Sequence, residues 1–289
     1  MDKTKFNCVV FGEILYDCFA DRTCLGGAAL NFAWNLRQLD FAVAMVSAVG
    51  IDNLGQQARA FLTDAGIEQQ WVADRAEPTG TVDVFLQDGQ PAYTIRTGVA
   101  WDHIGHTVEL ARAPDLIYYG TAAQRSPDNR SGLKRLLATN PRHRFFDVNL
   151  RKDCYTAETV LTGLAAATIV KLNDEEWVEI QRITDIDRPS EFVAHFALDC
   201  LAITLGEKGA QLHYAKDSYE KSLAPVPVVD AVGAGDAFSS VLAAGTLLDS
   251  NQQQILKLAC TAGARACRAM ECTDGGRATV VGLLLATAA

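Results

Sequence analysis

Residues 230–238 read Asp-Ala-Val-Gly-Ala-Gly-Asp-Ala-Phe, and an apolar, helix-prone run continues from there to Leu248. This order predicts a glycine-rich turn that leads into a helix, with the backbone amides of Gly233, Ala234 and Gly235 pointing outward. Such a helix start binds anions, and its field also keeps the carboxylate of Asp236 ionised. A carboxylate base beside an anion-binding turn indicates phosphoryl transfer to a hydroxyl group.

Short apolar strands alternate with helical segments on either side of this stretch. Strands are predicted at 8–11, 41–49, 115–119, 143–148, 169–172 and 200–205, and helices at 28–39, 53–65, 128–139, 157–166, 174–182, 190–197 and 252–269. This alternation is typical of an α/β fold with a parallel sheet. The polar clusters 147–151, 171–176 and 204–209 follow three of the strands, so we expect them to face one crevice.

Two segments depart from the alternation between strands and helices. Residues 79–87 and 91–97 alternate, are rich in Thr, Val, Tyr and Ile, and are joined across Asp88-Gly89, which predicts a β-hairpin. The sequence is equally consistent with an edge of the main sheet and with a small separate lid. A second hairpin is predicted from residues 210–215 and 219–223.

Composition narrows the class of protein. The 289 residues are 49% hydrophobic and carry a formal net charge of -9, which argues against nucleic-acid and membrane-surface partners. The eight cysteines include no Cys-x-x-Cys pair, so we expect buried thiols in a reducing compartment. The first residues lack the apolar segment of a signal peptide, and a cytoplasmic location is therefore expected.

The ordered series of motifs resembles the ribokinase-like (phosphofructokinase B) family of carbohydrate kinases, and within it the fructokinase and 2-keto-3-deoxygluconate kinase branch. The motifs, in chain order, are Gly12-Glu-Ile-Leu-Tyr-Asp17, Gly26-Gly-Ala-Ala-Leu-Asn31, Val49-Gly-Ile-Asp-Asn-Leu-Gly55, Asp147–Arg151, Asn173–Glu176, Thr204–Gly209 and Asp230–Phe238. The resemblance covers nearly the whole chain. It implies one kinase domain over residues 1–289, built as a three-layer α/β sandwich with a mostly parallel central sheet. A small β-lid would come from about 13–25 and 79–98.

The resemblance also implies the ligands and the residues that bind them. ATP would be the phosphoryl donor and Mg²⁺ the metal, and a monovalent cation such as K⁺ is common in the family. Asp236 would be the catalytic base, with the amides of Gly233, Ala234 and Gly235 as the anion hole. Sugar contacts would come from Asp17, Gly27, Asn31, Arg96 and Arg151. Thr204, Gly206 and Gly209 would lie along the nucleotide, and Asn173 and Glu176 would hold Mg²⁺ through water.

Several of these residues also have a purely structural interpretation. Gly-Ala-Gly before a helix is often only a close-packed turn, although a charged residue such as Asp236 is unusual there. Asn173 and Glu176 have the spacing of a capping box, which needs no metal. Arg96 and Arg151 have the alternative of surface ion pairs, and the glycines after Thr204 that of a bare turn.

The predicted function is an ATP-dependent sugar kinase acting on a small sugar, with fructose as the first expectation. A 2-keto-3-deoxygluconate-type kinase is the alternative enzyme, in which Arg96 and Arg151 would meet a carboxylate. A catalytically silent sugar- or nucleotide-binding regulator on the same fold is the alternative outside enzymes. An exposed lid face is often covered by a second subunit, so a homodimer through the lid is also expected.

Overall fold

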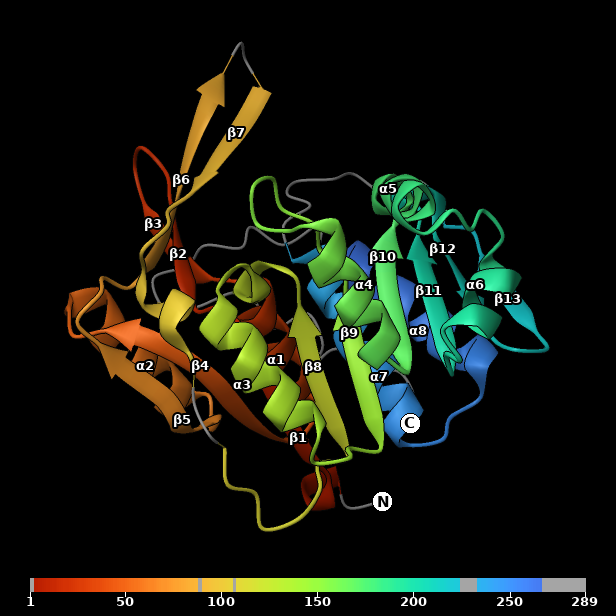
Figure 1. Cartoon of the computed structure of the whole chain (residues 1–289), viewed down its shortest axis with the longest axis horizontal. Coiled ribbons are helices and arrows are strands. Elements are labelled where there is room, and N and C mark those ends of the chain that lie inside the picture. The colour runs from red at the N-terminus through yellow and green to blue at the C-terminus, as the bar shows by residue number, and fades with distance from the viewer. Residues whose placement is uncertain (1–2, 88–89, 106–107, 224–232, 267–289) are drawn as a thin grey trace.

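Two β-sheets organise the computed structural model, which describes residues 3–87, 90–105, 108–223 and 233–266 (Figure 1). The strands of the larger sheet are β1 (Asn7–Phe11), β4 (Ala42–Gly50), β5 (Glu68–Arg75), β8 (Leu116–Gly120), β9 (His143–Asp147), β10 (Ile169–Asn173), β11 (Cys200–Thr204), β12 (Ala210–His213) and β13 (Ser218–Lys221). Their order is β13-β12-β11-β10-β9-β8-β1-β4-β5. All neighbours from β11 to β5 are parallel, and β12 and β13 add an antiparallel edge.

Helices cover both faces of this sheet. One layer contains α1 (Ala28–Gln38), α2 (Asn53–Asp64), α7 (Ala234–Leu247) and α8 (Gln252–Ala266); the other contains α3 (Pro127–Leu137), α4 (Ala157–Ala166), α5 (Asp174–Thr184) and α6 (Pro189–His195). Strand β1 shows why there are two layers. Its side chains alternate in direction, so Cys8 and Val10 join the core under α1 and α7, while Val9 and Phe11 join the core under α3 and α4. The predicted three-layer α/β architecture is confirmed.

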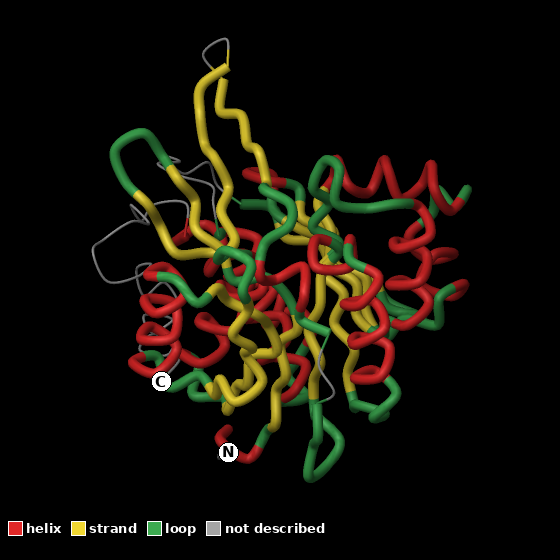
Figure 2. The backbone as a smooth tube through the Cα atoms, turned by 60° about the vertical axis from the view of Figure 1, so that its left-hand side comes forward, coloured by secondary structure: helices red, strands yellow, loops and turns green. Residues whose placement is uncertain are grey.

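The smaller sheet stands apart from the larger one. Its strands are β2 (Leu15–Cys18), β3 (Thr23–Gly26), β6 (Gly80–Gln87) and β7 (Gln90–Ile95), in the order β3-β2-β6-β7. In Figures 1 and 2 the β6–β7 hairpin projects well beyond the body of the molecule. The hairpin predicted around Asp88-Gly89 therefore belongs to a separate sheet and not to the edge of the main one.

A hydrogen-bond network anchors the entry to the smaller sheet. Asp52, the N-cap of α2, accepts bonds from the amides of Gly55 (2.7 Å) and Thr79 (2.8 Å), and from the Thr79 hydroxyl (2.7 Å). The same hydroxyl accepts the Gly50 amide at 2.9 Å. The end of β4, the start of α2 and the residue before β6 are thus held at one point. These bonds also lower the pKa of Asp52, although its partial burial acts in the opposite direction.

Two features differ from the sequence prediction. Strand β5 was not expected, because only Val72 and Ala73 of its eight residues are buried and the apolar signal is short. Among the described cysteines, Cys8, Cys18, Cys154, Cys200 and Cys260 are free, but Cys24 on β3 is disulfide-bonded, so the prediction of thiols throughout is wrong there.

Residues 230–232 and 267–269, which the predictions include, lie outside the described residues. In the described part of the chain, every helix is too short or too polar to traverse a lipid bilayer.

Candidate active site

The carboxyl ends of the parallel strands bring several polar side chains to one edge of the larger sheet. Strand β9 ends at Asp147, β10 at Asn173 and β11 at Thr204. The N-terminal half of α7 lies over the same region, because its Ser239 hydroxyl donates to Asp147. In open α/β sheets this edge is where ligands bind.

The start of α7 has the geometry of a tight helix entry. Gly233 is the N-cap with φ of 79°, a left-handed conformation that glycine adopts without strain. Ala234, Gly235 and Asp236 then form the first turn, and their amides precede the first i→i−4 bond of the helix, which runs from the Ala237 amide to the Gly233 carbonyl at 2.9 Å. A Cβ on Gly235 would lie 2.9 Å from the Lys171 ammonium nitrogen, so this glycine leaves room for a buried cation beneath the turn.

Asp236 meets a helix from the first part of the chain. The Asn31 side-chain amide on α1 donates to Asp236 Oδ2 at 2.6 Å. Helix α1 begins at Gly27, which has φ of 106°, and a Cβ there would lie 2.8 Å from the Glu13 carbonyl oxygen. The structure therefore brings Gly27, Asn31 and Asp236 together at the start of α1 and α7.

Glu13 is a second carboxylate at this place, and the sequence analysis did not select it. It is 5% exposed, and its Oε1 accepts the Ala29 amide in the first turn of α1 at 3.4 Å. Burial raises the pKa of Glu13, and the nearby Asp236 adds to the rise while Arg151 opposes it. Glu13 therefore caps α1 close to Gly27 and Asn31, two of the residues predicted to contact the sugar.

A buried ion pair lies under α7. Asp147 is fully buried and its Oδ1 accepts from Lys171 Nζ at 3.2 Å. Burial alone would lower the pKa of Lys171, but the Asp147, Glu176 and Asp236 carboxylates outweigh it and raise the pKa, so the ammonium stays charged. The sequence analysis gave neither residue a role. A lysine inside the apolar strand 169–172 was the available signal, because lysine is rarely buried without a partner.

Asn173 and Glu176 form the capping box that the sequence allowed. The Asn173 side chain accepts the Glu176 amide at 2.7 Å, and Glu176 Oε2 accepts the Asn173 amide at 2.8 Å. Glu176 Oε1 accepts the Leu150 amide at 2.8 Å. Burial raises the pKa of Glu176, and Lys171 opposes the rise. Each carboxylate oxygen has a further lone pair, so the pair fits contact with a metal through water. No cluster of three or more His, Cys, Asp or Glu side chains suited to direct metal binding occurs among the described residues.

The predicted nucleotide residues follow strand β11. The Thr204 hydroxyl donates to the Leu172 carbonyl at 3.3 Å. Gly206 has φ of 58° and open space around its Cβ position, so its backbone can be approached closely. Gly209 has φ of 112°, and a Cβ there would collide with the Lys221 carbonyl. Gly209 therefore has a structural reason to be glycine, whereas the space beside Gly206 is available to a ligand.

The three remaining predicted sugar residues lie in different surroundings. Asp17 is on β2 of the smaller sheet, between Cys24 of β3 and Val82 of β6. Arg96 is exposed and forms an ion pair with Asp83 at 3.0 Å, which is the surface pairing considered as its alternative role. Arg151 is exposed, and it lies near enough to Glu13 to influence that carboxyl group. The described structure thus links Arg151, but not Arg96, to the residues around Asp236.

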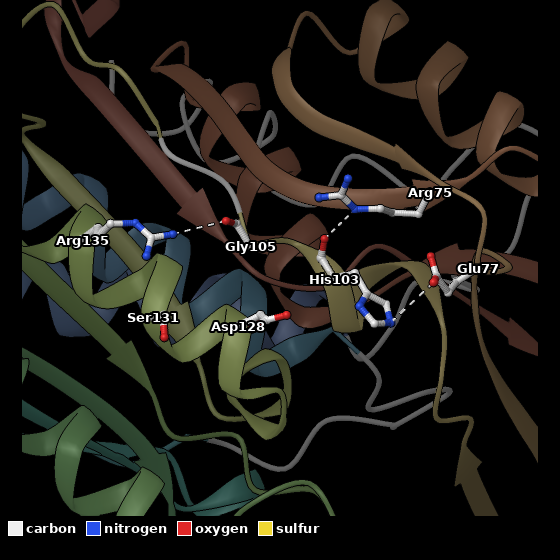
Figure 3. A pocket seen from close by; sticks show the side chains of 7 residues that line it. All are labelled: Arg75, Glu77, His103, Gly105, Asp128, Ser131 and Arg135. Atoms are coloured by element: carbon white, nitrogen blue, oxygen red, sulfur yellow. Dashed lines mark hydrogen bonds and ion pairs between the residues drawn. The ribbon is translucent and has the colours of Figure 1, made fainter.

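A separate pocket of about 420 Å³ lies beside η2 (Ala100–His103) and the start of α3 (Figure 3). Its lining residues are Arg75, Glu77, His103, Gly105, Asp128, Ser131 and Arg135. Arg75 Nε donates to the His103 carbonyl at 2.7 Å, and Arg135 donates to the Gly105 carbonyl at 3.2 Å. None of the predicted site residues lines this pocket. The candidate active site is therefore the edge of the larger sheet below α7.

The fold combines a parallel sheet with a smaller sheet beside it, and a helix start holds Asp236 at the edge of the parallel sheet. These features are together typical of an α/β phosphotransferase. The chain belongs to the pfkB family of carbohydrate kinases, whose family model matches residues 5–278. It is 27% identical over 274 residues to a fructokinase of Escherichia coli, with 89% of each chain covered. It is 24% identical over 271 residues to an aminoimidazole riboside kinase of Salmonella typhimurium, covering 89% of this chain and 85% of that one. The protein is therefore a kinase that transfers a phosphoryl group to a sugar hydroxyl.

Solved structures share this fold. The crystal structure of a fructokinase from Vibrio cholerae O395, bound to fructose, ADP and calcium ion, has a TM-score of 0.82 at 23% identity and covers 98% of this chain and 99% of its own. A sugar kinase from Pyrococcus horikoshii in complex with ATP has a TM-score of 0.78 at 21% identity, covering 96% of this chain and 94% of its own. These similarities establish the fold of the main sheet and its helices.

Proposed function

We propose that this sugar kinase is an ATP-dependent fructokinase with Asp236 as its catalytic base. The observation that carries the proposal is the 2.6 Å bond from Asn31 to Asp236 at the first turn of α7. It puts a fixed carboxylate next to helix amides that have no partner within the helix, which is the arrangement that in-line transfer to a hydroxyl requires. The fructokinases among the relatives favour fructose as the acceptor.

In the proposed reaction, Asp236 accepts the proton of the sugar hydroxyl as that oxygen attacks the γ-phosphorus of ATP. The bond from the γ-phosphorus to the bridging oxygen of ADP breaks, and the first-turn amides of α7 stabilise the charge on the phosphoryl oxygens. A positioned base typically contributes about 10²- to 10⁴-fold, while orientation of the reactants contributes about 7 to 11 kcal/mol. Positioning is therefore the larger part of the rate enhancement.

Other residues would bind and orient the two substrates. Gly27, Asn31 and Arg151 lie near Asp236 or Glu13 and would contact the sugar. Asp17 and Arg96, in and beside the smaller sheet, would also contact it, with that sheet acting as a lid. Thr204, Gly206 and Gly209 would lie along ATP. Asn173 and Glu176 would hold Mg²⁺ through water, and the ion would neutralise charge on the phosphates. Binding of a monovalent cation such as K⁺ and a homodimer through the smaller sheet are further parts of the proposal.

A coupled assay of ADP release over a panel of sugars tests this function. We expect turnover with fructose and ATP that depends on Mg²⁺. Asp236→Asn should lower kcat by about 10²- to 10⁴-fold while nucleotide affinity stays nearly unchanged. A kcat near the wild-type value in this variant would contradict the role of Asp236. Binding of sugars without turnover of any would instead favour a regulator.

A 2-keto-3-deoxygluconate-type kinase is the second candidate, and Arg151 is the observation that favours it. In the described part of the chain its guanidinium donates only to the Leu150 carbonyl and makes no ion pair, so a substrate carboxylate could pair with it. The panel should therefore contain 2-keto-3-deoxygluconate and an aminoimidazole riboside beside fructose. The highest kcat/KM identifies the substrate class, and Arg151→Lys should lower kcat/KM more for an acidic sugar than for fructose.

A further inference from the structure

Asp147 is the meeting point of four secondary-structure elements. It ends β9, and its Oδ2 accepts from the Ser239 hydroxyl on α7 at 2.8 Å and from the Tyr118 hydroxyl on β8 at 3.3 Å. Its Oδ1 accepts from Lys171 on β10 at 3.2 Å. The carboxylate therefore ties three neighbouring strands to the helix that carries Asp236.

Two of these contacts act on the first turns of α7. Ser239 is three residues after Asp236, and residues at this spacing are neighbours on one side of a helix. Lys171 Nζ lies so close to Gly235 that a Cβ there would approach it to 2.9 Å. The network thus holds the backbone on both sides of Asp236, whereas Asn31 holds the Asp236 side chain from α1.

The groups that bind Asp147 are better suited to fixing the orientation of α7 than to raising the stability of the fold. Buried ion pairs contribute little net stability compared with apolar packing of the same volume, but they require defined geometry. The partners of Asp147 are an ammonium group and two hydroxyls, all within the buried interior. Burial and the adjacent Asp147 raise the pKa of Tyr118 well above its usual value, so its hydroxyl remains a donor.

From these contacts we infer that Asp147 is a positioning residue for phosphoryl transfer. Together with Lys171 and Ser239 it sets the first turn of α7, so that Asp236 and the first-turn amides face the reacting atoms. This role rests on the proposed function of Asp236. It adds a part of the site that touches neither substrate.

Two adjacent serines allow a matched test. Ser239 and Ser240 are both fully buried on α7, but the Ser240 hydroxyl donates only to the Ala237 carbonyl of its own helix, at 2.8 Å. Ser239→Ala should lower kcat about tenfold, the effect of losing one hydrogen bond that orients the turn, with KM for sugar and ATP within about twofold of wild type. Ser240→Ala should leave kcat within about twofold. Equal kcat values for the two variants would overturn the inference.

Amide hydrogen exchange gives a readout that does not depend on turnover. The amides of residues 237–241, in the first turns of α7, should exchange several-fold faster in Ser239→Ala than in wild type or Ser240→Ala. Equal exchange in both variants would overturn the inference even if kcat fell. If the wild-type protein phosphorylates no sugar, the proposed function fails, and the exchange comparison still decides whether Asp147 orders this helix start. Asp147→Asn, which keeps an oxygen acceptor but removes the charge, should exceed Ser239→Ala in both effects.

Discussion

Asn31 Nδ2 lies 2.6 Å from Asp236 Oδ2, although the two residues are 205 positions apart in the chain. The bond joins α1 to the first turn of α7, and Asn31 is 7% exposed. An amide donor orients a carboxylate without neutralising it. The fold therefore sets the direction of the carboxylate that we propose as the catalytic base before substrate arrives.

Replacing Asn31 should mainly affect turnover. In Asn31→Ala the Asp236 carboxylate loses its orienting donor, so we expect kcat to fall by about 10- to 100-fold, because small misplacements of reacting groups are costly. A rise in the KM for sugar would accompany this fall if Asn31 also contacts the sugar. Steady-state kinetics with each substrate varied in turn measure both effects. Asn35→Ala, one turn further along α1 at another buried asparagine, is the control, and an equal loss there would contradict the role of the Asn31–Asp236 bond.

Adding a methyl group at Gly235 should disturb the cation beneath the turn. The new Cβ would lie 2.9 Å from Lys171 Nζ, so either the ammonium or the helix start must move. We expect Gly235→Ala to destabilise the fold by about 1 to 3 kcal/mol, as overpacking does, and to lower kcat as well. Urea unfolding and kinetics measure the two effects. In a Lys171→Ala background, which lacks the ammonium group, Gly235→Ala should cost less stability than it does in the wild type, and strict additivity of the two changes would argue against the clash.

The Thr79 hydroxyl should stabilise the junction between the two sheets. Thr79→Val removes bonds to Asp52 and to the Gly50 amide at a buried position, and we expect a loss of about 1 to 3 kcal/mol. Thr81→Val, two residues further along β6, is the control, because its hydroxyl makes no hydrogen bond in the described structure. The free energy of unfolding in urea distinguishes the two. Similar losses in both variants would show that the exchange of threonine for valine itself, and not the network, is responsible.

His143 should make stability depend on pH. Burial lowers its pKa, with Arg142 acting in the same direction, and neither ring nitrogen has a hydrogen-bond partner in the described structure. In the unfolded chain this histidine has a pKa of about 6.5, so as the pH falls it binds a proton at a higher pH than in the folded protein. Its contribution to the free energy of unfolding is therefore complete above about pH 6.5 and is lost as the pH falls toward the lower folded pKa.

His143→Leu removes this titration from both states. We expect the wild type to lose more stability than the variant between pH 7.5 and 5.5, as measured by urea midpoints at each pH. Other titrating groups, including the partly buried His213, are common to both proteins and cancel in the difference. Parallel pH profiles would show that His143 does not contribute.

Most strands and helices of the larger sheet and its two layers could be predicted from local sequence patterns. Strands such as 169–173 are short, mostly apolar runs and helices such as 157–166 carry a periodic apolar pattern, and neither signal depends on neighbouring elements. Strand β5 escaped the sequence analysis because its exposed edge position leaves little of that signal. The hairpin at 80–95 was predicted from its own pattern, but that pattern left its sheet open, because strand pairing is a long-range property; only the family resemblance grouped it with residues 13–25 in a lid.

The motif beginning at Asp230 was enough to predict phosphoryl transfer from the sequence, since a glycine-rich turn and a carboxylate at a helix start have local causes. Tertiary structure alone decided what surrounds Asp236. Asn31 reaches it from α1, and Asp147 and Lys171 brace its helix from the sheet, through contacts between residues far apart in sequence. The physical reason is burial: ionised groups enter the interior only where other elements supply their partners, and which elements meet there depends on the whole fold.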